Sequence, residues 1–205
     1  MSPILTSPFY TLQHEGVATL LRLRSEDGTN RLTRACVLAL TFAIEQLAAE
    51  ARPLVIAGNP KFFSAGAELA EIAALNAPSA YEFARMGQHL MRLVADFPAP
   101  VWAAISGYCM GGGLDLALAC HRRIASTHAV FGHRGAALGL ITGWGGTQRL
   151  PRLVGKGVAL EMFAAAEKIG AQRALAIGLI DAVVDDPVAE ASSAINERGC
   201  FSPKR

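Results

Sequence analysis

The sequence has few of the features that mark membrane, nucleic-acid-binding or secreted proteins. No apolar run approaches the ~20 residues that a membrane-spanning helix needs. The N-terminus has no basic segment, and Pro3 and Pro8 interrupt it, unlike a secretory signal. The net charge is only +2, and no Lys/Arg cluster is interleaved with aromatic residues. We therefore expect a cytoplasmic protein that binds neither membranes nor nucleic acid.

Cysteine and histidine are also sparse and scattered. The four cysteines have no short paired spacing of the zinc or redox type: Cys36, Cys109, Cys120 and Cys200. The five histidines share no ligand spacing with a carboxylate. We expect free, mostly buried thiols and no metal site.

What the chain does contain is a large apolar fraction in a regular order. Hydrophobic residues make up 52% of the 205 residues and charged residues 18%, as in a well-packed globular domain. Strand-like runs such as residues 101–105 alternate with helical patterns such as residues 33–50, which Thr33 can cap. This alternation predicts α/β architecture, with one core domain over residues 1–190 and a short tail over residues 191–205.

Capping residues indicate where other helices begin. Ser79, with Glu82 three residues later, has the spacing of a capping box for a helix that reaches Asp96. A short strand-like run, residues 53–57, precedes the segment KFFSAGAELAEI. In that segment residues 64–67 lead into a helical pattern, and Glu68 is expected in its first turn, where its charge suits the helix dipole.

The most informative segment is SGYCMGGGLDLALAC, residues 106–120. Its three consecutive glycines, Gly111 to Gly113, separate an apolar strand pattern from an apolar helical pattern. Such a turn directs backbone N–H groups outward, and the absence of Cβ atoms lets a ligand approach the main chain. With the similar turn at residues 64–67, two donors can form an oxyanion hole around one carbonyl oxygen. Two ordinary strand-to-helix turns fit the same pattern.

Three segments, FSAGAEL, SGYCMGGGLDLALAC and FGHRGAALGLITGWGGTQRLPRLVGKGVALEM, together resemble the crotonase (enoyl-CoA hydratase/isomerase) superfamily. The similarity covers residues 16–185, in the family's order and spacing. It implies the ββα spiral of the crotonase fold, an acyl-CoA or acyl-carrier thioester as substrate, and no cofactor besides the coenzyme A of the substrate. It also implies a homotrimer or hexamer and a role in fatty acid metabolism. The C-terminal helical region is shorter than is usual in the family, which weakens the expectation of an oligomer.

The resemblance also assigns roles to individual residues. The two oxyanion-hole donors fall on the backbone N–H groups of Ala67 and Gly112, and the loop with Ala65 is expected to hold the adenine end of coenzyme A. Lys61 and Arg85 are candidate phosphate partners, although a role in surface ion pairs is favoured for both. The expected substrate-binding positions are Ala65, Ala67, Glu68, Leu69, Gly111, Gly112, His133 and Trp144.

Catalytic acids decide which reaction is available. Family hydratases use two carboxylates, of which the first corresponds to Asp115 and the second to Gly135, which has no side chain. A further acid found in some isomerases and dehalogenases corresponds to Gly143. Asp115 is therefore the predicted acid/base, with a structural role as its alternative. Water addition is expected to be impaired, and double-bond migration through an enolate is favoured.

Other side chains leave alternatives open. His133 can titrate near neutral pH or be structural; Trp144 can line an acyl pocket or fill the core, and Tyr108 is expected to pack. A Cys109–His133 pair placed as in the Clp protease subunit, which shares this fold, predicts a thioester hydrolase, but only Glu167 lies near the place of a third triad member. A catalytically silent homologue that binds coenzyme A or a partner protein is the remaining alternative.

Overall fold

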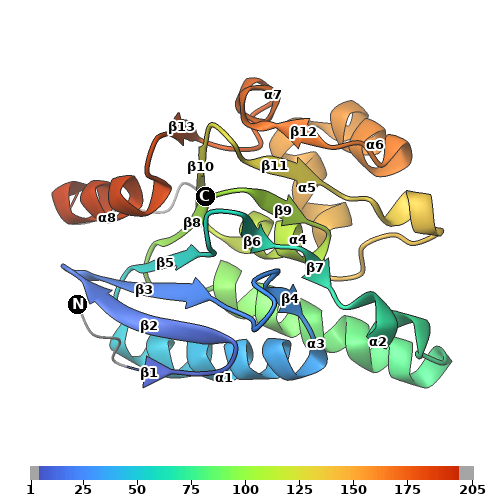
Figure 1. The fold of residues 1–205 in the computed structure, drawn as a ribbon, viewed down its shortest axis with the longest axis horizontal. Coiled ribbons are helices and arrows are strands. Elements are labelled where there is room, and N and C mark those ends of the chain that lie inside the picture. The colour runs from blue at the N-terminus through green and yellow to red at the C-terminus, as the bar shows by residue number, and fades with distance from the viewer. Residues whose placement is uncertain (1–4, 199–205) are drawn as a thin grey trace.

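The protein is described from a computed structural model, which covers residues 5–198. Its main element is a seven-stranded sheet in the order β1-β2-β3-β5-β8-β10-β13 (Figure 1). The strands from β3 to β13 pair in parallel, and β1 and β2 add an antiparallel edge. The strands of this sheet are β1 (Leu5–Thr6), β2 (Tyr10–Glu15), β3 (Ala18–Leu23), β5 (Leu54–Ala57), β8 (Val101–Ile105), β10 (Arg122–Ser126) and β13 (Ala182–Val184).

A second, smaller sheet lies beside the first, in the order β12-β11-β9-β6. The strand β5 is followed by β6, β8 by β9 and β10 by β11, so each step of the chain places one strand in each sheet before a helix follows. This repeating unit is the ββα spiral that was predicted. The remaining strands are β6 (Phe62–Ser64), β9 (Tyr108–Met110), β11 (Val130–Gly132), β12 (Ile169–Gly170) and the pair β4 (Arg31–Leu32) and β7 (Gly66–Ala67).

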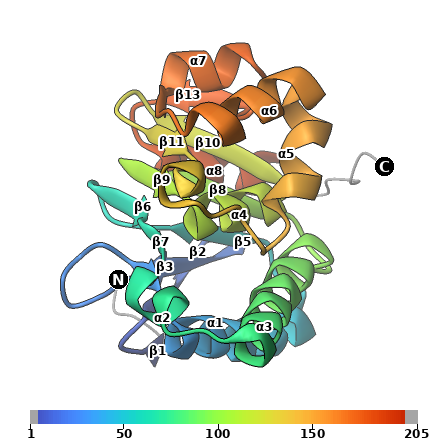
Figure 2. The same ribbon diagram turned by 90° about the vertical axis from the view of Figure 1, so that its right-hand side faces the viewer.

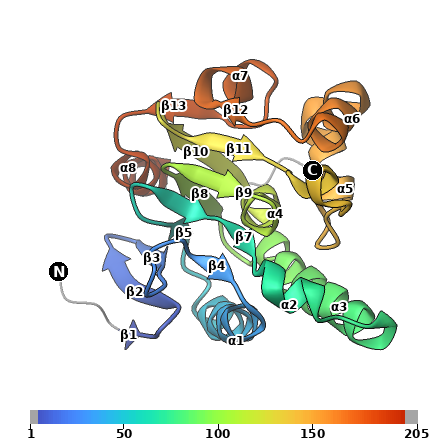
Figure 3. The same ribbon diagram turned by 45° about the vertical axis from the view of Figure 1, so that its right-hand side comes forward.

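Helices cover both faces of the main sheet, as Figure 3 shows for α8 on one side and α1 and α3 on the other. None of the helices in residues 5–198 combines the length and apolar character needed to cross a membrane. The helices are α1 (Arg34–Glu50), α2 (Leu69–Ala73), α3 (Ala77–Ala95), α4 (Gly112–Ala119), the 3-10 turn η1 (Gly135–Leu138), α5 (Gly146–Val154), α6 (Lys156–Ala165), α7 (Ala171–Ala176) and α8 (Pro187–Arg198).

The C-terminal helix α8 belongs to the core. Its Ala191 and Ile195 are buried in a cluster that includes Leu20 and Val55 from the main sheet. The predicted boundary at residue 190 falls inside this packed helix. The burial of α8 against a distant sheet face has no local signal in the sequence.

Of two predicted helix caps, one is confirmed and one needs correction. Helix α1 is capped by Thr33, as expected. Helix α3, however, begins at Ala77, and its cap is Asn76, whose side chain exchanges hydrogen bonds with Ser79 in a capping box. The residue expected to be the cap is thus the third residue of the helix.

The helix after the glycine turn lies at the centre of the molecule, where Figure 2 shows α4 surrounded by the other elements. All eight of its residues are buried. A helix that is apolar on every side is stable only inside a protein, so α4 presents its N-terminus and Asp115 from a rigid position. It begins at Gly112, two residues before the predicted start.

Candidate active site

A cavity of about 590 Å³ lies against the N-terminus of α4. Its walls come from the segment 62–84, from β9 and α4, and from residues 133–144. Seven of the eight predicted substrate-binding positions line it: Ala65, Ala67, Leu69, Gly111, Gly112, His133 and Trp144. The predicted acid Asp115 lines it as well.

Two backbone nitrogens meet at one wall of this cavity. A Cβ placed on Gly66 would lie 3.1 Å from the nitrogen of Gly112, and one placed on Gly112 would lie 3.3 Å from the nitrogen of Ala67. Gly66 has φ +95 and a Cβ there would be 2.6 Å from the Met110 carbonyl oxygen, so only glycine allows this approach. Gly112 is the first residue of α4, and its N–H has no partner within the helix.

The carboxyl group of Asp115 is nearly out of contact with solvent, at 1% exposure. One of its oxygens, Oδ2, accepts a hydrogen bond from the hydroxyl of Thr142. Burial raises the pKa of Asp115 to about 7, and the Thr142 hydroxyl, the charge of Arg149 and the nearby backbone N–H of Gly146 limit the rise. A carboxyl group with a pKa near 7 can both give and take a proton at neutral pH.

Opposite Asp115, the ring of His133 forms part of the cavity wall. Its Nε2 lies 3.5 Å from Oδ1 of Asp115. Burial lowers the pKa of His133 to about 4, so its ring is neutral at neutral pH. His133 therefore lies in the cavity wall beside the predicted acid, and its pKa lies below neutral pH.

Two aromatic side chains complete this part of the wall. Trp144 is 3% exposed, donates from Nε1 to the Phe83 carbonyl oxygen at 3.2 Å, and lines the cavity, so it both fills the core and walls the pocket. Tyr108 packs against Phe62 with 5.4 Å between ring centroids, as expected, and also borders the cavity.

Comparison with known proteins places the chain in a family. A sequence model of the enoyl-CoA hydratase/isomerase family matches residues 13–197. The chain belongs to this family, within the crotonase superfamily. It is 38% identical over 176 residues to the crotonyl-CoA hydratase of Syntrophomonas wolfei, covering 84% of this chain and 68% of the relative. It is 43% identical over 155 residues to a probable enoyl-CoA hydratase of Bacillus subtilis, covering 74% and 60%.

Solved structures of the family have the same fold. The superposition on DspI of Pseudomonas aeruginosa has a TM-score of 0.90 at 37% identity and covers 96% of this chain and 77% of that chain. For an enoyl-CoA hydratase from Bacillus anthracis the TM-score is 0.88 at 34% identity, with 95% and 78% covered. The chain thus spans three quarters of the length of these structures, and 60% of one curated relative.

Gly135, which the resemblance aligns with the second acid of family hydratases, has no space beside it for a side chain. A Cβ on Gly135 would lie 2.6 Å from the carbonyl oxygen of Leu140, and the Leu140 N–H donates to the Gly135 carbonyl at 2.8 Å. A glutamate at residue 135 would therefore have to displace backbone. Gly143, by contrast, borders the cavity and has only the Cβ of Ala84 nearby, at 3.8 Å.

This closure predicts a stability difference between two glycine substitutions. We expect Gly135→Ala to lower the free energy of unfolding by about 1–3 kcal/mol, because the new methyl group overpacks the loop. The control is Gly157→Ala in α6, where a Cβ meets no atom within 4 Å and alanine is the better helix former by about 1 kcal/mol. Urea unfolding of both variants measures the difference, and equal stability of Gly135→Ala and wild type would show that the loop can move.

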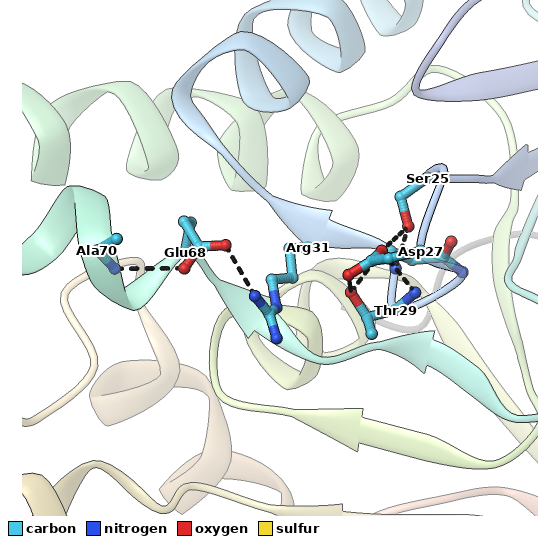
Figure 4. Close-up of polar contacts among 7 residues, drawn as sticks. Ser25, Asp27, Thr29, Arg31, Glu68 and Ala70 are labelled. Carbon is cyan, nitrogen blue, oxygen red and sulfur yellow. Dashed lines mark hydrogen bonds and ion pairs between the residues drawn. The ribbon is translucent and has the colours of Figure 1, made fainter.

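Glu68 is the predicted position that lies outside the site. It is the N-cap of α2, where its side chain accepts from the Ala70 N–H, and it forms an ion pair with Arg31 at 3.0 Å (Figure 4). The nearby loop is closed by Asp27, whose carboxylate accepts from Ser25 and Thr29. Glu68 does not line the cavity, so a substrate contact there stays a prediction, whereas its expected place in the first helical turn is corrected to the N-cap.

Within residues 5–198 the three cysteines, Cys36, Cys109 and Cys120, are free and buried, as expected. Cys200 lies outside the residues that the structure describes. Cys109 is fully buried on β9, whose neighbouring residues Tyr108 and Met110 line the cavity from the opposite face. Burial raises the pKa of the Cys109 thiol well above its usual range, which disfavours the nucleophilic thiolate. The burial of Cys109 and its raised pKa therefore argue against the Cys109–His133 hydrolase.

The charged residues at the cavity differ from those expected. Lys61 and Arg85 lie over the rings of Phe62 and Tyr81, away from the cavity lining. Lys168 and Arg134 do line it, and the Lys168 ammonium lies 5.0 Å from the Tyr108 ring centre. Sequence reasoning missed both. Lys168 comes back beside the cavity from far along the chain, just before β12, and Arg134 directly follows the predicted His133 but was not singled out. Among residues 5–198, no cluster of three or more His, Cys, Asp and Glu side chains is placed to hold a metal ion.

Proposed function

We propose that this protein is an acyl-CoA enzyme that forms the enolate of a thioester. The observation that carries the proposal is the meeting of the Ala67 and Gly112 nitrogens at the cavity wall, one turn of α4 from a buried carboxyl group. Two N–H donors aimed at one oxygen stabilise the negative charge that develops there when a neighbouring C–H bond is broken. The positive end of the α4 dipole adds to this stabilisation.

Asp115 is the proton carrier of the proposed reaction. Its carboxylate takes a proton from C2 of the acyl group, and the electron pair of the C–H bond moves to the thioester oxygen held by the two N–H groups. Return of the proton to C2 gives exchange, and in a 3-enoyl thioester its delivery to C4 of the dienolate moves the double bond to C2–C3. The hydroxyl of Thr142 fixes the carboxyl group by its hydrogen bond to Oδ2. The elevated pKa of about 7 suits a group that must accept and release the same proton.

The rest of the cavity suits the two ends of such a substrate. Apolar side chains around it provide room for an acyl chain: Leu69, Ile72, Leu75, Phe83, Leu138 and Ile141. Lys168 and Arg134 are the cations nearest to it and are the ones we assign to the anionic part of coenzyme A. The homotrimer or hexamer expected for the family stays a prediction, which sedimentation velocity tests.

Calorimetry tests the ligand. We expect butyryl-CoA to bind at least about tenfold more tightly than butyrate, because the nucleotide and pantetheine supply binding energy remote from the carbonyl group. Incubation with butyryl-CoA in D₂O tests the chemistry, since enolate formation replaces the C2 hydrogens with deuterium. Binding without exchange would favour the catalytically silent homologue, and equal affinity for acid and thioester would contradict the proposal.

A further inference from the structure

The cavity holds a second titratable side chain that enolate formation leaves unused. His133 is 4% exposed, and its Nε2 faces Oδ1 of Asp115 at 3.5 Å. Within residues 5–198 neither of these two buried atoms has a hydrogen-bond partner. A buried polar atom without a partner costs free energy, and such atoms in a native protein usually serve a ligand, a water molecule or a reaction.

The surroundings hold the pair together. Helix α5 begins at Gly146 with Gly145 as its cap, and a Cβ on Gly146 would overlap Oδ1 of Asp115 and lie 3.1 Å from Nε2 of His133. Any residue with a Cβ there would collide with the Asp115 carboxyl group. On its other side the imidazole packs against the ring of Phe163, with 5.1 Å between the ring centroids.

Few other charges act on this pair. From α4 His133 meets Asp115, from α6 it meets the apolar Phe163, and its sequence neighbour is the exposed Arg134. From α5 the charge of Arg149 favours the ionised form of Asp115, and the Cys109 thiol on β9 is neutral. Burial lowers the pKa of His133 to about 4 and raises that of Asp115 to about 7. A single proton on the pair therefore resides on Asp115 and leaves His133 neutral.

Resting on the enolate chemistry above, we propose that His133 is the second proton-transfer residue, in place of the acid that Gly135 lacks, and that the site adds water to a 2-enoyl thioester. Nε2 of His133 takes a proton from water as its oxygen bonds to C3. The C2–C3 π electrons move toward the thioester oxygen. Asp115 then gives its proton to C2, and the imidazolium returns its proton to Oδ1 of Asp115, so that one water molecule is added and both groups are restored.

The two reactions of this site then have opposite pH dependence. Hydration needs one proton on the pair, so its kcat/KM falls as the pH rises through about 7 and Asp115 ionises. Exchange of C2 hydrogens needs the carboxylate, so its kcat/KM rises over the same range. If His133 had only a structural role, hydration would be absent, or its kcat/KM would rise with pH as that of exchange does.

The test compares crotonyl-CoA hydration with butyryl-CoA deuterium exchange in the same preparations. We expect wild-type protein to catalyse both, and His133→Gln, which can hold water but cannot carry its proton, to lose about 100-fold or more in hydration and less than tenfold in exchange. The matched control is His128→Gln, an exposed histidine before β11, with wild-type hydration.

Each outcome bears on one proposal or the other. Wild-type exchange without hydration, or full hydration by folded His133→Gln, would overturn the role of His133 and leave the enolate function standing. Absence of both reactions in wild-type protein would overturn the enolate function itself. If His133→Gln does not fold, the wild-type pH profiles decide, because parallel limbs for hydration and exchange would overturn the inference without any variant.

Discussion

Asp115→Asn is expected to reduce deuterium exchange at C2 of butyryl-CoA by about 10²- to 10⁴-fold, the usual effect of losing a general acid–base group. The amide has the shape of the carboxyl group but cannot take a proton. In wild-type protein the exchange rate should rise with pH through about 7, because only the ionised carboxylate accepts the C2 hydrogen. This limb of the pH profile should be absent in the variant.

The same substitution is expected to stabilise the fold at alkaline pH. The folded pKa of about 7 lies above the ordinary value of 3.8, so the folded state holds this proton more tightly and wild-type stability falls as the pH rises from about 4 to 7. At about 1.4 kcal/mol for each pH unit, the cost above pH 7 is on the order of 4 kcal/mol. The amide introduced by Asp115→Asn avoids the cost of burying a charge, so chemical unfolding at pH 8 should show a variant at least as stable as wild type.

This combination separates catalysis from structure. Asp185→Asn serves as the control, because Asp185 is exposed and lies outside the cavity lining. It should keep wild-type exchange. An Asp115→Asn protein that is folded and retains more than a tenth of the wild-type exchange rate would contradict the role of Asp115 as proton carrier.

The sequence was a good guide where one local pattern determines the structure. The helical pattern over residues 33–50 and the Thr33 cap predicted both ends of α1. The three glycines before an apolar run predicted the buried helix α4. Such features depend on residues a few positions apart. The family's motifs contain most of the residues that line the cavity, because the lining comes mainly from the turns and loops within them.

The errors concern contacts between distant segments. Thr142 reaches Asp115 across 27 positions, which no local pattern indicates. Even over five residues, the irregular loop gives no sign that the Leu140 carbonyl fills the space beside Gly135. β9 has only three residues, too few for alternation to show that Cys109 faces away from the cavity. The pairing of Asp115 with His133 likewise depends on how α4 and the end of β11 pack, which the sequence does not reveal locally.

Ala67→Pro is expected to reduce kcat/KM for exchange by about 10²- to 10³-fold, the usual effect of removing one oxyanion-hole donor. Proline has no N–H, and residue 67 already carries a Cβ, so the loss of the donor is the main chemical change. The other donor is less suitable for this test, because a Cβ on Gly112 would lie 2.6 Å from the Trp144 ring and would alter the packing as well. Ala67→Ser keeps the N–H and should stay within about tenfold of wild type.

Carbonyl polarisation gives a measurement that does not depend on the variant folding. If the N–H groups of Ala67 and Gly112 hold the thioester oxygen, the C=O stretching frequency of an enoyl-CoA should fall when it binds wild-type protein, because two hydrogen bonds draw electrons toward the oxygen. Folded Ala67→Pro should show a smaller decrease, whereas Ala67→Ser should show the full one. An unchanged frequency on binding to wild-type protein would mean that the two nitrogens meet at the cavity wall without holding the substrate's carbonyl group.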